Sequence, residues 1–156
     1  MARELALGCS LAVALIAGCD KERAAAPAST TEGATEAAAK GAPPLAARPF
    51  YRVDAKPVAP CASGSTCEAQ LVLTALGDYH VNDEYPTKFV ADATGEVAVE
   101  GHTFKIEGAK RGTLTVRFKA AKPGPATLTG TFKLSVCNED NCEIEAPAIA
   151  LPVTST

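Results

Sequence analysis

Large apolar residues alternate with polar ones along much of this chain from about residue 48 onward. The stretch "ATLTGTFKLSV" (residues 126–136) has its large apolar side chains on one face: Leu128, Phe132, Leu134 and Val136. Threonines, a lysine and a serine occupy the other face. A period of two residues is typical of a β-strand with one buried face. The same kind of pattern predicts strands over residues 50–58, 69–76, 96–101, 102–108 and 112–119.

Short clusters of Gly, Pro, Asp and basic residues separate these strands and predict turns. They lie at residues 77–78, 94–95, 110–112 and 122–125. No part of residues 48–156 has a helical period of apolar residues. About seven or more short strands in about 105 residues predict an all-β fold, an immunoglobulin-like antiparallel β-sandwich. An antibody-type domain would add a core Trp and two widely separated cysteines, and this sequence has neither.

The first residues form an apolar run that ends at a cysteine. Residues 5–17 are apolar apart from Ser10, too short a run for a mature membrane-spanning helix but suited to a signal peptide. The run ends in "LIAGC", which resembles the lipobox of bacterial lipoproteins, so Cys19 is expected to carry lipid. An ordinary cleaved signal is the disfavoured alternative, because charged residues begin directly after Cys19. The sequence predicts a lipoprotein signal peptide over residues 1–18, and Cys9 is expected to leave the protein when this peptide is cleaved.

The segment after the predicted lipidation site is rich in Ala and Pro. Residues 19–47 contain almost no large apolar side chains, so they cannot bury a core and predict a disordered, flexible tether. A tether of about 30 residues spans roughly 30 Å on average. The sandwich domain is expected to occupy residues 48–156. The expected location is the bacterial cell envelope as a periplasm-facing lipoprotein, with the inner or outer membrane left open.

Net charge and cysteine content reduce the range of possible functions. The net charge is −3 in 156 residues, so the chain lacks the basic surface of a nucleic-acid-binding protein. Four cysteines remain in the exported part: Cys61, Cys67, Cys137 and Cys142. Disulfides are expected in this oxidising setting. Four cysteines allow three connectivities, and the sequence does not choose among them.

The motif "CNEDNC" (Cys137 to Cys142) allows three interpretations: a metal clip, a structural staple or a redox pair. Export disfavours zinc. Structural zinc sites favour two to four residues between paired ligands; the gap of five between Cys61 and Cys67 exceeds this range, and the gap of four between Cys137 and Cys142 is at its upper limit. As a staple, the short loop would contribute only about 2 kcal/mol. The neighbouring carboxylates disfavour thiolates, which favours a reducing or neutral couple over a strong oxidant. No metal or organic cofactor is expected.

Two islands carry a family resemblance: "GDYHVNDEYPTKF" (residues 77–89) and "FKLSVCNEDNCEIEAPAIALPV" (residues 132–153). Together they resemble the N-terminal periplasmic domain of the thiol:disulfide interchange protein DsbD. The resemblance implies an immunoglobulin-like fold with a redox pair at Cys137 and Cys142. It also implies an acidic-aromatic cap loop, here Asp83, Glu84 and Tyr85 with His80 just ahead, that covers the pair. A half-buried Tyr85 in a simple turn is the competing interpretation.

The sequence departs from this family at several points. Ser135 and Val136 stand where the family often has an aromatic-Gln pair, and Pro147 follows the second cysteine later than is usual. The membrane hub and the thioredoxin-like module of the full-length family are missing. The expected partners are therefore a separately encoded membrane thiol reductase and thioredoxin-like envelope proteins.

The other cysteines and the histidines have simpler interpretations. Cys61 and Cys67 flank a Ser/Gly loop, for which a structural disulfide is favoured over a second redox pair or cross-pairing. His80 and His102 are expected to make local hydrogen bonds rather than bind copper or zinc. The leading hypothesis is a lipid-anchored thiol–disulfide exchange module that uses Cys137 and Cys142. The alternative is a non-catalytic β-sandwich lipoprotein with structural disulfides that binds an envelope protein or component.

Overall fold

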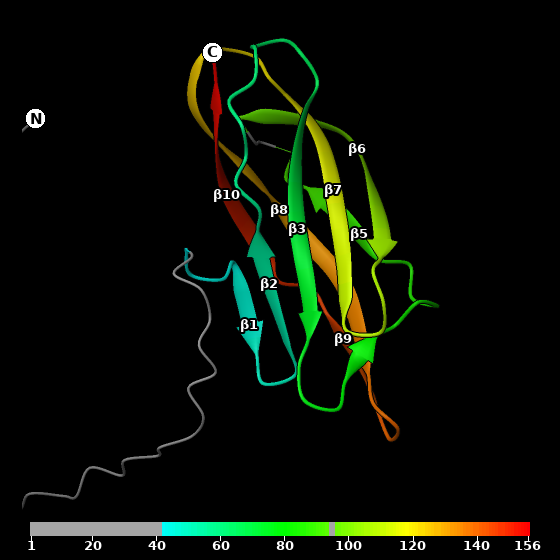
Figure 1. The fold of residues 1–156 in the computed structure, drawn as a ribbon. Helices are drawn as coiled ribbons and strands as arrows, with labels where there is room; N and C mark the ends of the chain where they lie inside the picture. Colours follow the sequence, from blue (N-terminus) through cyan, green and yellow to red (C-terminus); the bar gives the residue numbers. More distant parts are fainter. Residues whose placement is uncertain (1–41, 94–95) are drawn as a thin grey trace, which may run out of the picture. The chain divides into compact units, whose positions relative to one another are not determined.

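A computed structural model describes residues 42–93 and 96–156. The predicted signal peptide, the lipidation site Cys19 and most of the tether lie outside the described residues, as does the turn predicted at 94–95. The described residues form strands and no helix (Figure 1). The strands are β1 (Ala46–Arg48), β2 (Tyr51–Ala55), β3 (Cys67–Ala75), β4 (His80–Val81), β5 (Lys88–Ala91), β6 (Val97–Ile106), β7 (Arg111–Ala120), β8 (Gly124–Cys137), β9 (Cys142–Glu145) and β10 (Ala148–Ser155). Nothing in these two ranges is a helix long and apolar enough to cross a membrane.

The strands form two antiparallel sheets. The first sheet has the order β1-β2-β3-β7-β6. The second is built on the long strand β8, which pairs with β10, β9, β5 and β4. The prediction of an all-β antiparallel sandwich is therefore confirmed.

One continuous register joins β9 and β10 to the same side of β8. Glu145 pairs with Leu134 and Ala148 pairs with Thr131, so the chain advances three residues on each strand between these two pairs and the register is unbroken. The Phe132 N–H donates to the Pro147 carbonyl between the two strands, at 3.0 Å. Because the register is unbroken, the hairpin that carries both cysteines of "CNEDNC" is fixed to the core by the whole length of β8.

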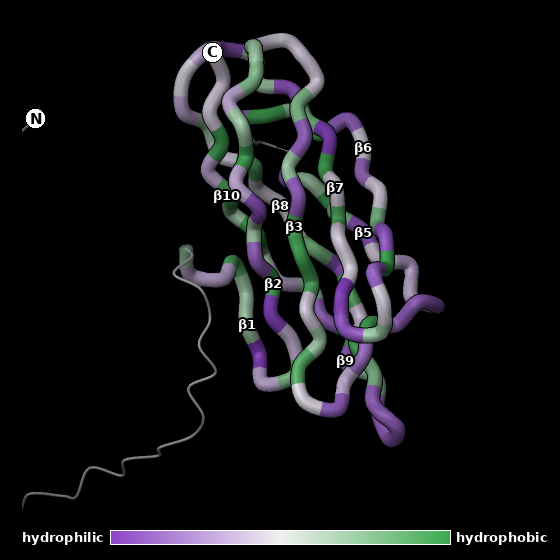
Figure 2. Tube along the Cα trace, viewed as in Figure 1, coloured by the Kyte–Doolittle hydropathy of each residue, from purple (hydrophilic) through white to green (hydrophobic). Residues whose placement is uncertain are grey.

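The core lies between the sheets, and it uses the faces that the alternation predicts. The predicted apolar face of β8 is fully buried, as are the facing side chains of β3 and β7; the set is Leu71, Leu73, Leu114, Val116, Leu128, Phe132, Leu134 and Val136. Alternating hydrophobic and hydrophilic positions can be followed along these strands in Figure 2. Each such side chain contributes about 1.5–3 kcal/mol when it is removed from water.

The prediction of separate strands over residues 96–101 and 102–108 is wrong. They form the single strand β6, in which the pairing with β7 shifts between Val99 and Gly101. A β-bulge inserts one residue without ending the strand, and glycine accommodates the local bend. The glycine here marks a bulge rather than a turn.

The turn predicted at residues 110–112 lies a few residues earlier. The chain reverses at Gly108, whose φ of 96° is in the region that favours glycine, and the Arg111 N–H donates to its carbonyl at 3.3 Å. Gly112 is instead a buried residue of β7. A Cβ on Gly112 would lie 2.2 Å from the ring of Phe104, so close packing rather than turning requires a glycine there.

Candidate functional site

The four cysteines form two disulfides, Cys61–Cys67 and Cys137–Cys142. This is one of the three connectivities that the sequence left open, and no bond crosses between the two pairs. The two disulfides lie in different structural settings, and these settings separate their roles.

Cys61–Cys67 lies where the two sheets meet. Cys61 forms a parallel bridge with Ser155 at the end of β10, in the second sheet. The Thr156 N–H donates to the Cys61 carbonyl at 2.8 Å, and the Ser63 N–H donates to the Thr156 carbonyl at 2.9 Å. Cys67 is buried at the start of β3, in the first sheet. The bond therefore connects the last strand of one sheet to a central strand of the other, as a structural disulfide would.

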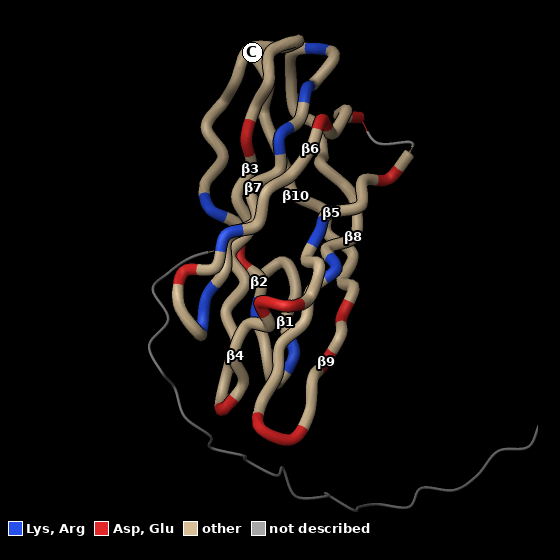
Figure 3. Tube along the Cα trace, turned by 90° about the vertical axis from the view of Figure 1, so that its right-hand side faces the viewer, with Lys and Arg blue, Asp and Glu red and all other residues tan. Residues whose placement is uncertain are grey.

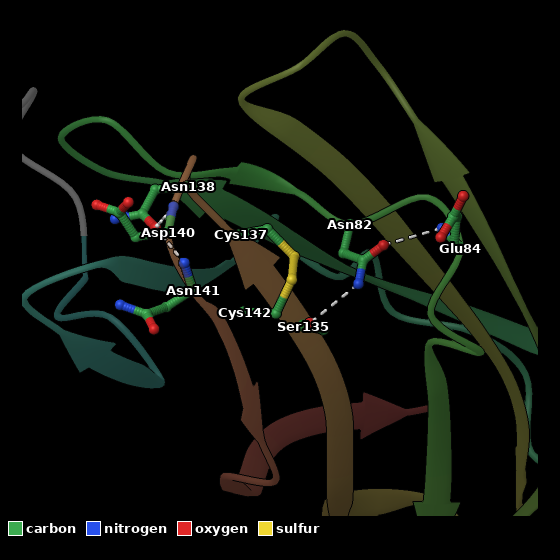
Figure 4. Close-up of a disulfide and its surroundings, with 8 residues drawn as sticks. All are labelled: Asn82, Glu84, Ser135, Cys137, Asn138, Asp140, Asn141 and Cys142. Atoms are coloured by element: carbon green, nitrogen blue, oxygen red, sulfur yellow. Dashed lines mark hydrogen bonds between the residues drawn. A yellow bond between two sulfur atoms is a disulfide. The ribbon is translucent and has the colours of Figure 1, made fainter.

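Cys137–Cys142 closes the hairpin between β8 and β9 (Figure 4). The two cysteines are direct cross-strand partners, with Cα atoms 4.0 Å apart. Beyond them the Asn138 N–H donates to the Asn141 carbonyl at 2.9 Å. Hydrogen-bonded and non-hydrogen-bonded pairs alternate along an antiparallel ladder, so the cysteines occupy a non-hydrogen-bonded pair, where side chains are closest.

The two cysteine residues differ in exposure. Cys137, the last residue of β8, is only 6% exposed. Cys142, the first residue of β9, is exposed. An incoming group from solvent can therefore approach Cys142, while Cys137 lies behind it.

The side chain of Asn138 organises the turn between the cysteines. Its Oδ1 accepts hydrogen bonds from the N–H groups of Asp140 at 3.0 Å and Asn141 at 2.8 Å (Figure 4). Its Nδ2 donates to Oδ2 of Asp78 at 3.1 Å, which connects the hairpin to the loop between β3 and β4. Asn is suited to this position because its short amide side chain bonds the backbone two residues on.

The loop ahead of β5 begins beside the disulfide. His80 of β4 is the cross-strand partner of Cys137. Two residues later the Asn82 N–H donates to the Ser135 carbonyl at 3.1 Å, and Asn82 Nδ2 donates to Ser135 Oγ at 3.3 Å. Asn82 Oδ1 in turn accepts from the Glu84 N–H at 3.0 Å (Figure 4). Asn82 therefore fixes the start of the predicted cap loop to β8, two residues from Cys137.

The pairing on this side of β8 shows why the loop must leave the sheet. Val81 pairs with Val136, and Lys88 pairs with Lys133. Residues 82–87 therefore span the same length of sheet as residues 134–135 of β8. The excess chain bulges outward beside the cysteine pair.

The predicted cap residues occupy this bulge. Asp83 and Glu84 are exposed, and Tyr85 is half-buried. The Thr87 N–H donates to the Tyr85 carbonyl at 2.7 Å, which tightens the loop after the ring. The loop thus lies beside the same end of β8 as the disulfide. Shielding of the sulfurs by the Tyr85 ring stays a prediction.

Acidic residues surround the hairpin. Glu139 and Asp140 are exposed in the turn, and Glu143 and Glu145 follow on β9. Figure 3 shows acidic segments at the loop tips beside β4 and β9. Lys110 lies at the neighbouring loop between β3 and β4, where its Nζ donates to the Gly77 carbonyl at 2.8 Å and also to the Tyr79 carbonyl. The charge around the disulfide is therefore negative.

Glu145 also acts across the sandwich. It raises the pKa of Tyr51 above its usual value of 10.0, as a smaller contribution than burial of the phenol itself; Arg48 acts in the opposite direction. The carboxylate at the end of β9 therefore acts on a residue of β2 in the other sheet. At the opposite end of the hairpin, Asn138 is bonded to Asp78.

Sequence patterns did not single out three residues that matter at this site. Asn82 and Asn138 start turns, and an Asn at the first position of a turn is the signal that would have found them. Ile144 is 66% exposed, although an isoleucine in an alternating strand is expected to be buried. Only the pairing of β9 with β8 shows that Ile144 shares the outer face with Cys142.

The two histidines lie on different sheets. Across the described ranges, no group of three or more His, Cys, Asp or Glu side chains is arranged to hold a metal ion. His102 pairs with Val116 in the first sheet, whereas His80 lies on the second. Comparison with known proteins adds no identity: no family model, no curated protein and no solved structure matches this chain.

Proposed function

We propose that this chain is a lipid-anchored, extracytoplasmic thiol–disulfide exchange module that passes reducing equivalents through Cys137 and Cys142, similar to the N-terminal domain of DsbD. The observation that carries the proposal is the difference in exposure of the two cysteine residues. An exposed cysteine bonded to a buried one offers a partner a single point of attack. Cys61–Cys67, by contrast, is incorporated where the sheets meet.

The exposure of Cys142 supports the following order of bond changes. A thiolate of a reduced dithiol protein attacks Sγ of Cys142, the Cys137–Cys142 bond breaks, and Cys137 leaves as a thiolate that takes a proton from water. The donor's second thiolate then attacks its own sulfur in the mixed disulfide. Cys142 is released as a thiolate, and the donor departs as a disulfide after giving up two electrons.

The reduced module passes the same two electrons onward. The Cys142 thiolate attacks a disulfide of a thioredoxin-like envelope protein and forms a second mixed disulfide. Cys137 then attacks Cys142, which restores the original bond and releases the acceptor as a dithiol. Thiols and disulfides of the two partner proteins balance every step, so this chemistry requires no metal or organic cofactor.

The surroundings support a reductant rather than an oxidant. Strong oxidants of this class gain their potential from a stabilised thiolate. Carboxylates at Glu139, Asp140 and Glu143 disfavour a thiolate, so the reduced pair gains no such stabilisation. The turn organised by Asn138 keeps the two cysteines adjacent, which favours closure of the bond after each exchange.

A redox titration with thiol alkylation and mass spectrometry tests the proposal. Cys137 and Cys142 are expected to titrate as one two-electron couple in the folded domain, while Cys61 and Cys67 stay oxidised. A Cys137→Ser variant should trap a mixed disulfide between Cys142 and a thioredoxin-like protein, and Cys142→Ser, the matched control, should trap none. If Cys137–Cys142 opens only when the domain unfolds, the relay is wrong.

The same titration decides the rival function, a non-catalytic β-sandwich lipoprotein that binds an envelope component. The hydrogen bonds of Asn138 favour this rival, because they would hold the hairpin equally well for a purely structural bond. The membrane anchor is tested separately. Replacement of Cys19 by Ser should move the protein from the membrane fraction to the soluble fraction, and unchanged membrane attachment would contradict the lipobox.

A further inference from the structure

β9 is an edge strand with unpaired backbone groups. In the described part of the chain it pairs with β8 alone. Asn138 and Asn141 form a hydrogen-bonded pair, and such pairs alternate with non-hydrogen-bonded ones along the ladder. The backbone N–H and C=O groups of Glu143 and Glu145 therefore also point toward β8. The N–H and C=O groups of Cys142 and Ile144 therefore point away from β8. Such an edge is a template for one more strand.

The side chains along this edge are unusual for an unpartnered strand. Cys142 and Ile144 share the outer face, because residues two apart on a strand point the same way. Ile144 is 66% exposed, and the other large hydrophobic that is markedly exposed among the described residues is Val90, at 43% on β5. An apolar side chain beside the accessible sulfur gives the edge a point of contact for a partner.

The acidic charge of the β9 edge favours a partner segment of opposite charge. Glu143 and Glu145 lie on β9 itself, and Glu139 and Asp140 lie at the hairpin tip. No Lys, Arg or His occurs from residue 134 to residue 156. Two copies of this edge would repel each other, so a second copy of the chain is disfavoured. A segment with Lys or Arg beside its cysteine has the complementary charge.

Strand addition also gives the geometry that thiol–disulfide exchange needs. β8, β9 and an added strand would lie side by side, with Cys137, Cys142 and the partner's cysteine in one row. The incoming sulfur would then approach Cys142 from the side opposite the leaving sulfur of Cys137, as displacement at sulfur requires. Directly opposed side chains have Cβ atoms about 4.5–5.5 Å apart, close to the separation of about 3.8 Å across a disulfide.

We infer that the β9 edge (Cys142 to Glu145) is the docking surface of the module, and that it accepts an extended, basic, cysteine-bearing segment of the redox partner as an additional strand. The inference rests on the proposed function for its redox consequence. The docking itself is a separate property of the edge.

Binding is measured first, with peptides that cannot exchange. One peptide has a central serine between Val and Thr residues with lysines at both ends; its counterpart has glutamates in place of the lysines. The basic peptide should bind at least about tenfold more tightly at low salt, and added salt should reduce the difference. NMR shifts should centre on the amides of Cys142 and Ile144. A basic peptide N-methylated at alternate positions keeps its charge but cannot pair, and it should bind weakly.

Variants then locate the surface. Ile144→Ser should weaken the basic peptide several-fold, whereas Val90→Ser, the matched control on β5, should leave its affinity unchanged. Equal affinities for basic, acidic and N-methylated peptides, or equal effects of the two variants, would overturn the docking surface.

The same peptides with cysteine in place of serine separate this inference from the proposed function. The basic cysteine peptide should open Cys137–Cys142 faster than the acidic one, and Ile144→Ser should slow it without changing the rate with 2-mercaptoethanol. Reduction by 2-mercaptoethanol without any peptide preference refutes the docking surface and leaves the redox pair. Selective binding at the edge without reduction by any thiol refutes the redox pair and leaves the docking surface.

Discussion

At the scale of single residues, the Asn138 side chain holds the turn of the hairpin that carries the proposed redox pair. Its amide bonds two backbone N–H groups of its own turn and the carboxylate of Asp78 in the neighbouring loop. An aspartate could accept the same backbone hydrogen bonds but would repel Asp78. The choice of Asn over Asp in an otherwise acidic motif therefore has a physical reason.

Replacement of Asn138 by Ala should lower the free energy of unfolding by about 1–3 kcal/mol, because three hydrogen bonds are lost together. Asn141→Ala is the matched control, since Asn141 contributes its backbone N–H and C=O to the turn and keeps both in the variant. Urea denaturation of both variants measures the difference. Equal losses of stability would show that the Asn138 amide does not organise the turn.

Tyr51 gives the fold a predictable response to high pH. Burial, assisted by the charge of Glu145, raises its pKa above 10.0, so the folded state retains the phenol proton longer than the unfolded chain does. The stability that Tyr51 contributes is fully present below pH 10 and is lost as the pH rises through the folded pKa. Tyr51→Phe should flatten this decline when unfolding free energies are measured from neutral pH to about pH 11. An unchanged decline would assign it to other groups.

At the scale of elements, the strands were predictable where one face is buried along the whole element. Leu128, Phe132 and Leu134 of β8 alternate with polar residues because the sheet has one dry face and one wet face. The bulge in β6 was not predictable, because Gly101 gives the same signal for a turn and for a bulge. The shift in pairing that places residues 82–87 beside the disulfide depends on β8, which lies far away in sequence.

The candidate site was predictable in its residues but not in its pairing. The motif "CNEDNC" identified Cys137 and Cys142 as candidate site residues, but the sequence also allowed each of them to form a disulfide with Cys61 or Cys67. Their unequal exposure follows from the end of β8 and the start of β9, which only the folded sheet defines. Ile144 was not predictable as an exposed residue, since its exposure results from the lack of a strand beyond β9 in the described structure.

The loop between β4 and β5 is predicted to cap the Cys137–Cys142 disulfide, and this predicted role depends on the aromatic ring of Tyr85. If Tyr85 shields the sulfurs, Tyr85→Ala should speed reduction of Cys137–Cys142 by 2-mercaptoethanol several-fold, because a small thiol gains access to Cys142. Tyr85→Phe retains the ring and should keep the slow rate. Stopped-flow reduction followed by alkylation measures both. The same rate in all three proteins would remove the shielding role and leave Tyr85 as a residue of the turn.

At the scale of the whole molecule, the two disulfides lie in different settings, and the proposed function assigns them different roles. Cys61–Cys67 lies where the chain crosses between sheets, and the backbone around it bonds both the end of β10 and, through the Gly64 N–H, the Ala120 carbonyl of β7 at 2.9 Å. Cys137–Cys142 lies at the turn between β8 and β9, beyond the pairing of β8 with β10 and β5. The proposed exchange requires that Cys137–Cys142 open while Cys61–Cys67 and the pairing of the sheets stay intact.

Two paired variants test this division. Cys61→Ser with Cys67→Ser, and Cys137→Ser with Cys142→Ser, remove loops of nearly equal length, so chain entropy predicts a similar loss of about 2 kcal/mol for each. Hydrogen exchange should nevertheless differ. The amides of Ser63 and Thr156 are hydrogen-bonded between the Cys61–Cys67 segment and the end of the chain. Loss of Cys61–Cys67 should increase their exchange, whereas loss of Cys137–Cys142 should leave them protected. Loss of protection throughout β8 and β10 in the second pair would mean that Cys137–Cys142 is part of the structural frame, and a bond with that role could not turn over in the folded protein.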